Sequence, residues 1–342
     1  MTTARIAVHS PGRVNIIGDH TDYAGGLALP CAIDLGVSIT GHTDDERIEL
    51  RSGTLDGTVS FPIDALPAIA SIEPRWGRHV AAVAAELRTP NGLIGRIDST
   101  LPVGAGLSSS AAFDVALALA LGPDEPSMEL ARLAQRAETT AVGVPCGLLD
   151  EMSVVFGRTD HAMLIDFDDE TFEQVPFPED LSIWIVHSGQ ERELADSQYA
   201  ERRRSCEIAT ERIGPLATAS IADLDVLDGD LGRRARHVIT ECERVRLAAA
   251  ALRDGDPVRL GELMVQSHAS LRDDFDVSTP ILDDLVARLI AIPGVHGARL
   301  TGAGFGGCVI AICDRGSITD PTELTGRGWL VRPAGGAHRM AD

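Results

Sequence analysis

The segment Leu101-Pro102-Val103-Gly104-Ala105-Gly106-Leu107-Ser108-Ser109-Ser110 is the feature that most limits how this chain can fold. A β-branched run, 94–100, precedes it, and an alanine-rich run, 111–121, follows it directly. This order predicts a strand, a glycine-rich turn and a helix that starts at the turn. Glycines let the backbone approach a phosphate closely, and the free N–H groups of a helix start favour an anion. A serine-rich helix cap is the plainer interpretation, but three serines behind two glycines favour a phosphate site.

The chain contains no lysine, so all 30 basic residues among its 342 are arginines. Schiff-base chemistry, a pyridoxal-phosphate anchor and a Walker-type phosphate loop are therefore excluded, because each needs a lysine amine. Any phosphate has to be held by backbone amides, hydroxyls and arginine. With 51 acidic residues the net charge is −21. Such a polyanion is repelled by nucleic acid and by anionic lipid, so we expect neither as a partner.

A second polar segment, Pro11-Gly12-Arg13-Val14-Asn15-Ile16-Ile17-Gly18-Asp19-His20-Thr21-Asp22-Tyr23, lies beside a hydrophobic run near the N-terminus. A loop with solvated charges is one interpretation. A site for a hydroxyl-rich ligand such as a sugar is the other, because carboxylates and imidazole exchange hydrogen bonds with hydroxyl groups. The residue types alone leave the two interpretations open.

A third glycine-rich segment, Leu300-Thr301-Gly302-Ala303-Gly304-Phe305-Gly306-Gly307-Cys308, stands between two strand-like runs. A hairpin turn needs only one or two glycines. Four of them indicate that the backbone closely approaches something, although the sequence does not indicate what it approaches. The pattern is weak evidence for any particular ligand.

Strand-like runs alternate with helical patterns along the whole chain, so we expect an α+β fold in each half. Strands are predicted at 4–9, 14–17, 35–40, 47–50, 94–100, 298–301 and 308–313, and helices at 111–121, 128–141, 258–271 and from 280 onward. The acidic stretch 166–180 contains proline and is the best candidate for a junction. We therefore predict an N-terminal domain, 1–178, and a C-terminal domain, 179–342. No C-x-x-C pair or zinc-type cluster occurs among the six cysteines, which indicates a reducing, cytoplasmic setting.

Four further residues have both a structural and a chemical interpretation. Asp150 follows an apolar stretch and is either a buried base or, more commonly, a helix N-cap. Glu138 lies on the polar face of its predicted helix and by default is solvated. Tyr199 and His268 lie on predicted helices, where such side chains usually belong to the core.

Taken together and in this order, the three glycine-containing segments resemble those of the GHMP small-molecule kinases, and within them the galactokinases. The stretches between them match as well, from about residue 5 to residue 313. Trp76 stands where galactokinases stack a tryptophan on adenine. The runs around 138–150, 197–203 and 267–274 are also galactokinase-like, and the last separates this chain from the mevalonate and homoserine kinase branches.

The resemblance implies a two-domain fold, with a ribosomal-protein-like N-terminal domain, a ferredoxin-like C-terminal domain and the active site between them. It implies ATP-dependent phosphorylation of a monosaccharide at the C1 hydroxyl, with Mg²⁺. Asp150 would accept or hold the anomeric proton beside Arg13. By the same resemblance, the sugar would be bound by Arg13, Asp19, His20, Asp22, Gly147, Asp150 and Tyr199. ATP would be bound by Trp76, Gly104, Ala105, Gly106, Leu107, Ser108, Ser109 and Ser110. Mg²⁺ would be bound by Ser110 and Glu138.

The chain departs from the family pattern mainly on the sugar side. Asp19 stands where galactokinases usually have glutamate, Glu151 where they have glutamine, and Thr139 and Ala200 where they have asparagine. Galactose is the expected substrate; a 1-kinase for another hexose or hexose derivative is the alternative, and a catalytically silent sugar sensor is disfavoured by the intact Ser108–Ser110 run with Arg13 and Asp150. We expect a cytoplasmic monomer or weak homodimer with no membrane and no nucleic-acid partner.

Overall fold

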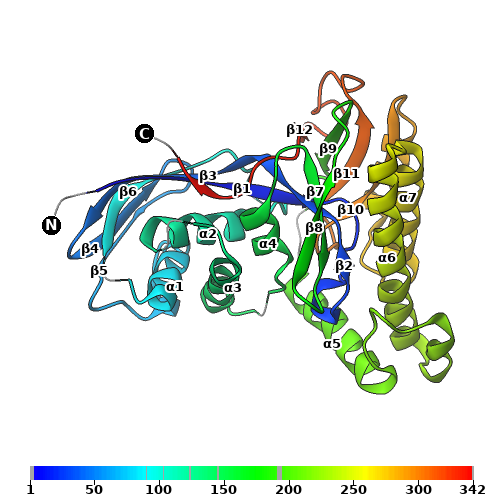
Figure 1. Ribbon diagram of the computed structural model, residues 1–342, viewed down its shortest axis with the longest axis horizontal. Helices are drawn as coiled ribbons and strands as arrows, with labels where there is room; N and C mark the ends of the chain where they lie inside the picture. Colours follow the sequence, from blue (N-terminus) through cyan, green and yellow to red (C-terminus); the bar gives the residue numbers. More distant parts are fainter. Residues whose placement is uncertain are drawn as a thin grey trace.

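The computed structural model describes residues 4–89, 91–102, 104–122, 125–144, 146–190 and 195–340. Val103 of the phosphate-type segment and Pro145 before Asp150 lie outside these ranges. In the described part no helix is long and apolar enough to cross a membrane. The elements form three sheets, with helices on one side of the largest sheet and at the opposite end of the molecule (Figure 1).

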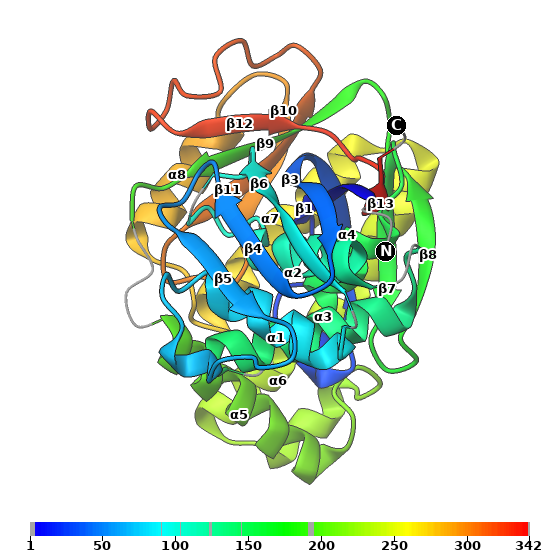
Figure 2. The same ribbon diagram turned by 90° about the vertical axis from the view of Figure 1, so that its left-hand side faces the viewer.

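The largest sheet has six strands in the order β13-β1-β3-β6-β4-β5. Its strands are β1 (Arg5–Asn15), β3 (Pro30–Asp44), β4 (Arg47–Ser52), β5 (Thr58–Pro62), β6 (Gly92–Ser99) and β13 (His338–Arg339). All neighbouring pairs are antiparallel except β4 and β6. Because β13 pairs with β1, the C-terminal end of the chain returns to the sheet in which the described chain begins, and both ends lie near one another (Figures 1 and 2).

Four helices cover one face of this sheet (Figure 1). They are α1 (Gly77–Leu87), α2 (Ser109–Leu121), α3 (Met128–Val142) and α4 (Leu149–Phe156). Helix α2 is apolar all round, and ten of its thirteen residues are buried because α1, α3, α4 and the sheet surround it. The N-terminus of α2, which carries the serine triplet, is thereby fixed on the core.

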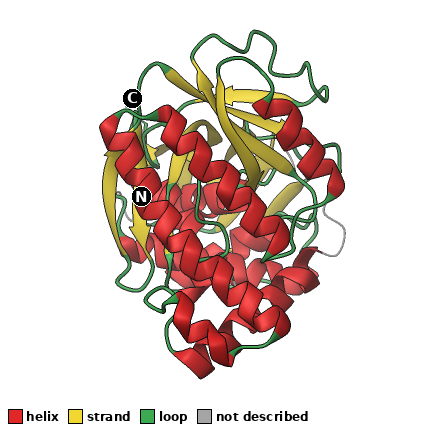
Figure 3. Ribbon diagram, turned by 90° about the vertical axis from the view of Figure 1, so that its right-hand side faces the viewer, coloured by secondary structure: helices red, strands yellow, loops and turns green. Residues whose placement is uncertain are grey.

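The second half of the chain builds a four-stranded antiparallel sheet in the order β10-β11-β9-β12. Its strands are β9 (Leu181–His187), β10 (Val295–Thr301), β11 (Cys308–Asp314) and β12 (Gly328–Val331). Helices α7 (Pro257–Asp273) and α8 (Pro280–Ile290) pack on β10, α6 (Gly229–Asp254) packs on α7, and α5 (Ala195–Ile213) packs on α6 (Figure 3). A three-stranded sheet, β2-β7-β8, from β2 (Leu27–Ala28), β7 (His161–Asp166) and β8 (Thr171–Pro176), lies between the two halves (Figure 1).

Two expectations about local structure were wrong. The runs 4–9 and 14–17 were expected to be separate strands, but β1 is a single strand whose register shifts between Pro11 and Arg13. Two steps along β1, from Pro11 to Arg13, oppose four steps along β3, from Gly36 to Ala32, so the extra residues of this irregularity lie on β3. The chain was also expected to end with the strands near 298–301 and 308–313, whereas β12 and β13 follow them. The boundary at 178/179 falls between β8 and β9 and stays a prediction.

Candidate active site

The phosphate-type segment forms a tight turn that leads into α2. Gly104, Gly106 and Ser108 have positive φ angles of 75°, 72° and 56°. A Cβ at Gly104 would meet nothing within 4 Å, so this part of the turn is open. Ala105 and Leu107 are buried and support the turn from the inside. The turn therefore presents glycine backbone and serine hydroxyls at a helix start.

A cavity of about 730 Å³ lies against this turn. It is lined by groups from both halves of the chain. The lining residues include Arg13, Asp19, His20, Asp22, Gly104, Gly106, Ser108, Ser109, Ser110, Glu138, Gly147, Asp150, His187, Tyr199, Gly302, Ala303 and Arg327. All the residues that the sequence assigns to the sugar and to the metal are in this set. Trp76, Ala105 and Leu107 are the predicted site residues that are absent from it.

Asp150 is held from two sides in the first turn of α4. Its Oδ1 accepts a hydrogen bond from Arg13 Nε at 2.7 Å and lies 2.6 Å from Arg13 Nη2. Its Oδ2 accepts a hydrogen bond from the Ser108 hydroxyl. The N-cap of α4 is Leu148, so the helix-cap interpretation of Asp150 was wrong. The carboxylate has a fixed orientation and faces the cavity.

Arg13 also ties the two segments together. Its Nη1 donates to the Gly106 carbonyl at 2.8 Å, and its backbone N–H donates to the Leu107 carbonyl at 3.2 Å. A Cβ on Gly12 would lie 2.7 Å from the same Leu107 oxygen, so only glycine permits this approach. The first segment therefore delivers its arginine against the phosphate-type turn.

Glu138 and Ser110 form the next group along the cavity. Glu138 is 8% exposed and accepts a hydrogen bond from the Ser110 hydroxyl, so the default interpretation of a solvated glutamate was wrong. Burial and the nearby Asp114 raise the pKa of Glu138. Glu151 is fully buried next to it, and burial together with Glu138 raises the pKa of Glu151 well above its ordinary value. This region therefore concentrates carboxyl groups with few cations to balance them.

Asp22, Gly147 and Tyr199 meet on the other side of the cavity. A Cβ on Gly147 would come within 1.6 Å of Asp22 Oδ2, so any larger residue here would displace the Asp22 carboxylate. Burial raises the pKa of Asp22 to about 6, and burial with Asp22 nearby raises the pKa of Tyr199 well above its ordinary value. The Tyr199 ring lies 5.6 Å from the rings of both His20 and Tyr23. The group combines hydroxyl and carboxyl functions with aromatic surface.

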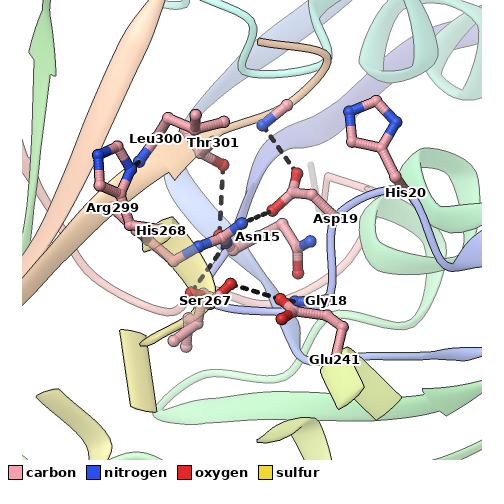
Figure 4. Close-up of polar contacts among 12 residues, drawn as sticks. Asn15, Gly18, Asp19, His20, Glu241, Ser267, His268, Arg299, Leu300 and Thr301 are labelled. Carbon is pink, nitrogen blue, oxygen red and sulfur yellow. Dashed lines mark hydrogen bonds and ion pairs between the residues drawn. The ribbon is translucent and has the colours of Figure 1, made fainter. Parts of the chain in front are cut away.

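Asp19 is anchored by residues far away in the sequence (Figure 4), and His20 is held by one nearby and one distant residue. Asp19 forms an ion pair of 2.5 Å with Arg299 Nη2 and accepts a hydrogen bond of 2.8 Å from the Gly302 N–H. His20 lies 2.9 Å from the Tyr23 hydroxyl through Nδ1 and 3.3 Å from the Ala303 carbonyl through Nε2. Burial and His237 lower the pKa of His20 to about 3, so its ring is neutral.

Trp76 belongs to a second cavity of about 310 Å³, which is mainly apolar. Its ring lies edge-on to Phe113 with centroids 6.3 Å apart, and its Nε1 donates to the Asp56 carbonyl at 3.1 Å. Ser109 and Ser110 line both cavities. The apolar cavity therefore adjoins the phosphate-type turn, where a flat base attached to a phosphate chain would fit.

Comparisons with known proteins agree with this arrangement. The chain is 38% identical to the galactokinase of Roseiflexus sp. (strain RS-1), over 98% of this chain and 93% of that protein. It is 39% identical to the galactokinase of Thermococcus kodakarensis, over 90% of this chain and 89% of that protein. The chain belongs to the galactokinase family. This confirms the resemblance that the three segments indicate.

The family models and solved structures agree with the assignment. The galactokinase galactose-binding signature matches residues 2–42, the GHMP kinase N-terminal domain 76–158 and the GHMP kinase C-terminal domain 248–319. The structure of Lactococcus lactis galactokinase complexed with galactose superposes with a TM-score of 0.87 at 30% identity and covers 98% of this chain and 95% of that one. A mevalonate kinase structure shares the fold, with a TM-score of 0.72 at 19% identity, over 96% of this chain and 98% of that one. The predicted α+β, two-domain GHMP kinase fold is confirmed.

Some residues at the site were not predicted from the sequence. The structure adds His187, Arg327, Gly302 and Ala303 to the cavity wall and places Arg299 behind Asp19. Arg299 and Gly302 belong to the third glycine-rich segment or adjoin it, so the four glycines there were the available signal. His187 and Arg327 carry no pattern that distinguishes them from ordinary strand-end and loop residues.

Proposed function

We propose that the protein transfers the γ-phosphoryl group of ATP to the C1 hydroxyl of galactose. The observation that carries this proposal is the position of Asp150. Its carboxylate is fixed by Arg13 and Ser108 in one cavity, with the phosphate-type turn on one side and Asp22, Gly147 and Tyr199 on the other. The relatives named above are galactokinases, and the family model that matches residues 2–42 describes galactose binding.

Each side of the cavity has a distinct part in this proposal. The turn 104–110 would hold the triphosphate through backbone N–H groups and serine hydroxyls, and the apolar cavity beside Trp76 would hold adenine. Asp22, Gly147 and Tyr199 would meet the sugar hydroxyls. Asp150 would accept the proton of the C1 hydroxyl or hold that hydroxyl in line for attack. Arg13 would stabilise both the Asp150 carboxylate and the negative charge on the phosphoryl oxygens.

The residues present fit Mg²⁺. Ser110 and Glu138 offer a hydroxyl and a carboxylate oxygen in contact with one another, the donor types that Mg²⁺ takes from proteins. Among the described residues no cluster of three or more His, Cys, Asp or Glu side chains could hold a metal, which agrees with an ion bound mainly by phosphates and water. When bound, Mg²⁺ would neutralise phosphate charge; the excess of carboxyl groups around Glu138 and Glu151 would favour such a cation.

The experiment is an ADP-release assay with galactose and a panel of other hexoses, comparing the wild type with Asp150→Asn. We expect galactose to be the best substrate. We expect Asp150→Asn to lower kcat by about a thousandfold or more while KM for ATP stays within a few-fold. Asp169→Asn, which alters an exposed carboxylate in the turn between β7 and β8, is the matched control and should change neither. Equal losses in kcat and in ATP affinity would make Asp150 a structural residue and refute its proposed role.

A further inference from the structure

The third glycine-rich segment closely approaches the first segment, near the N-terminus. The Gly302 N–H donates to Asp19 Oδ1 at 2.8 Å, and the Ala303 carbonyl lies 3.3 Å from His20 Nε2. Because the Tyr23 hydroxyl occupies the other ring nitrogen of His20, the neutral ring donates to Ala303 through Nε2. Two backbone groups of the third segment are therefore hydrogen-bonded to two neighbouring side chains of the loop that would bind the sugar.

Arg299 extends this contact beneath the loop (Figure 4). It lies on β10 and is 0% exposed. Its Nη1 donates to the Ile16 carbonyl at 3.2 Å, and its Nη2 lies 2.5 Å from Asp19 Oδ2. One guanidinium thus holds the loop backbone just after β1 and the carboxylate three residues further on. No ligand contact is needed to explain its burial, but a buried charge has to be compensated, and Asp19 compensates it.

Other parts of the C-terminal half fix the same stretch of backbone. His237 on α6 lies 3.1 Å from the Asp19 carbonyl through Nε2, and Glu241 on the same helix accepts a hydrogen bond of 3.0 Å from the Gly18 N–H. His20 itself has a φ of +64°, a conformation that a residue other than glycine keeps only when its surroundings hold it. The loop is therefore held in one conformation from outside.

We propose that Arg299 is a positioning residue for sugar binding, which sets the loop that carries His20 and Asp22 through its bonds to Ile16 and Asp19. This inference rests on the proposed function. Asp22, three residues after Asp19, lines the cavity, whereas Arg299 does not. Loss of Arg299 would leave Asp19 without its partner and would let this loop shift. A misplacement of about 1 Å in a group of an active site can lower activity by about a hundredfold. We therefore expect the affinity for the sugar to fall while KM for ATP is unaffected.

The test compares Arg299→Lys with the double variant Asp19→Asn/Arg299→Gln. Lysine keeps the charge but cannot bond to a carbonyl and a carboxylate with a planar fork. The double variant removes both charges together, so no unpaired ion stays buried if Arg299→Lys fails to fold; it is compared with Asp19→Asn alone, because Asp19 itself lines the cavity. We expect KM for the sugar, and its dissociation constant measured by calorimetry without ATP, to rise by about ten- to a hundredfold in each variant that folds. KM for ATP should stay within about twofold.

Asp283→Asn is the matched control. It removes the carboxylate that pairs with His268 at 3.1 Å, and His268 is bonded to the Leu300 N–H, next to Arg299 in β10. Burial lowers the pKa of His268 to about 4, so this contact is a hydrogen bond of a neutral ring. Among the described residues, neither His268 nor Asp283 is hydrogen-bonded to the loop at residues 15–22, so sugar KM should stay at the wild-type value. Folded Arg299 variants with unchanged sugar KM, or with sugar and ATP KM raised alike, would overturn the inference.

Failure of the proposed function gives a different result. If the wild type does not phosphorylate galactose, that proposal is wrong, and the same KM comparison is then made with the hexose it does phosphorylate. A role of Arg299 in stability alone would lower the melting temperature and the active fraction without changing either KM. A rise in the sugar KM without a rise in the ATP KM therefore distinguishes a positioning role of Arg299 from a role in stability alone.

Discussion

Glu151→Gln should stabilise the protein, and the gain should grow with pH. Glu151 is fully buried beside Glu138, and burial together with this neighbour raises its pKa well above the ordinary value of 4.5. The folded protein therefore holds this proton to a higher pH than the unfolded chain does. Each pH unit by which the pKa is raised costs about 1.4 kcal/mol of stability once the pH exceeds that pKa. Glutamine has nearly the same shape and has no proton to lose.

The sign of the pH dependence follows from proton linkage. Between pH 4.5 and the raised pKa the folded protein binds more protons than the unfolded chain, so stability falls as pH rises. The Glu151→Gln variant has no carboxyl group at this position, so it does not lose stability in this way. We expect equal stability for both proteins near pH 4 and an advantage of the variant at pH 7, of about 1.4 kcal/mol for each pH unit by which the pKa of Glu151 is raised. Urea unfolding from pH 4 to 8, with EDTA and without nucleotide, measures this difference.

Glu241→Gln is a control of opposite sign. Glu241 is equally buried, but although burial opposes its ionisation, Arg244 and His237 lower its pKa to about 2. Its ionised form is therefore stabilising above the ordinary glutamate pKa, and Glu241→Gln should destabilise the protein at pH 7. If Glu151→Gln were destabilising, or stabilising by the same amount at every pH, the interpretation of Glu151 as a buried acid with a raised pKa would be refuted.

Three other predictions concern the cavity. Ser108 has a positive φ of 56°, so Ser108→Gly should raise the melting temperature and Ser108→Ala should not. Both variants lose the hydroxyl that donates to Asp150, so both should lower kcat by about ten- to a hundredfold. If the kcat values of the two variants differed and followed their melting temperatures, this interpretation would be wrong. Burial raises the pKa of Asp22 to about 6, so kcat/KM for galactose should fall below pH 6, and Asp22→Asn should remove that acid limb as well as weaken binding. Trp76→Ala should raise KM for ATP by about tenfold without changing KM for galactose, as separate titrations of each substrate would measure.

The sequence was most informative where a residue type is required by local geometry. The glycines and serines of 104–110 predicted the turn before α2, and the structure has that turn with positive φ at Gly104 and Gly106. The sequence could not predict that Arg13 and Asp150 lie close together, because they are 137 positions apart. Their 2.7 Å hydrogen bond depends on how β1 and α4 pack around α2.

Tertiary contacts decide what the local sequence pattern could not show. The helix pattern alone placed Glu138 on a solvated face, and only the resemblance paired it with Ser110; in the structure α3 turns that face toward the cavity, where Glu138 meets Ser110. Arg299 stands in a strand whose pattern predicts only alternation, and nothing local reveals that its side chain lies 2.5 Å from Asp19, 280 positions earlier. Periodicity indicates which face of an element is buried, but not which buried polar groups will meet.

Carboxyl groups outnumber arginine side chains in the lining of the cavity. Asp19, Asp22, Glu138 and Asp150 all line one cavity. Asp19 and Asp150 are each paired with an arginine, whereas the pKa values of Asp22 and Glu138 are raised. The cavity therefore balances two carboxylates with guanidinium groups, while burial shifts the other two toward their protonated forms. A triphosphate with its Mg²⁺ would add a cation beside Glu138 and would lower the pKa of that carboxyl again. Nucleotide binding should accordingly release protons in the pH range where Glu138 titrates, which calorimetry in buffers of different ionisation enthalpy measures; a heat of binding that does not depend on the buffer would contradict the raised pKa of Glu138.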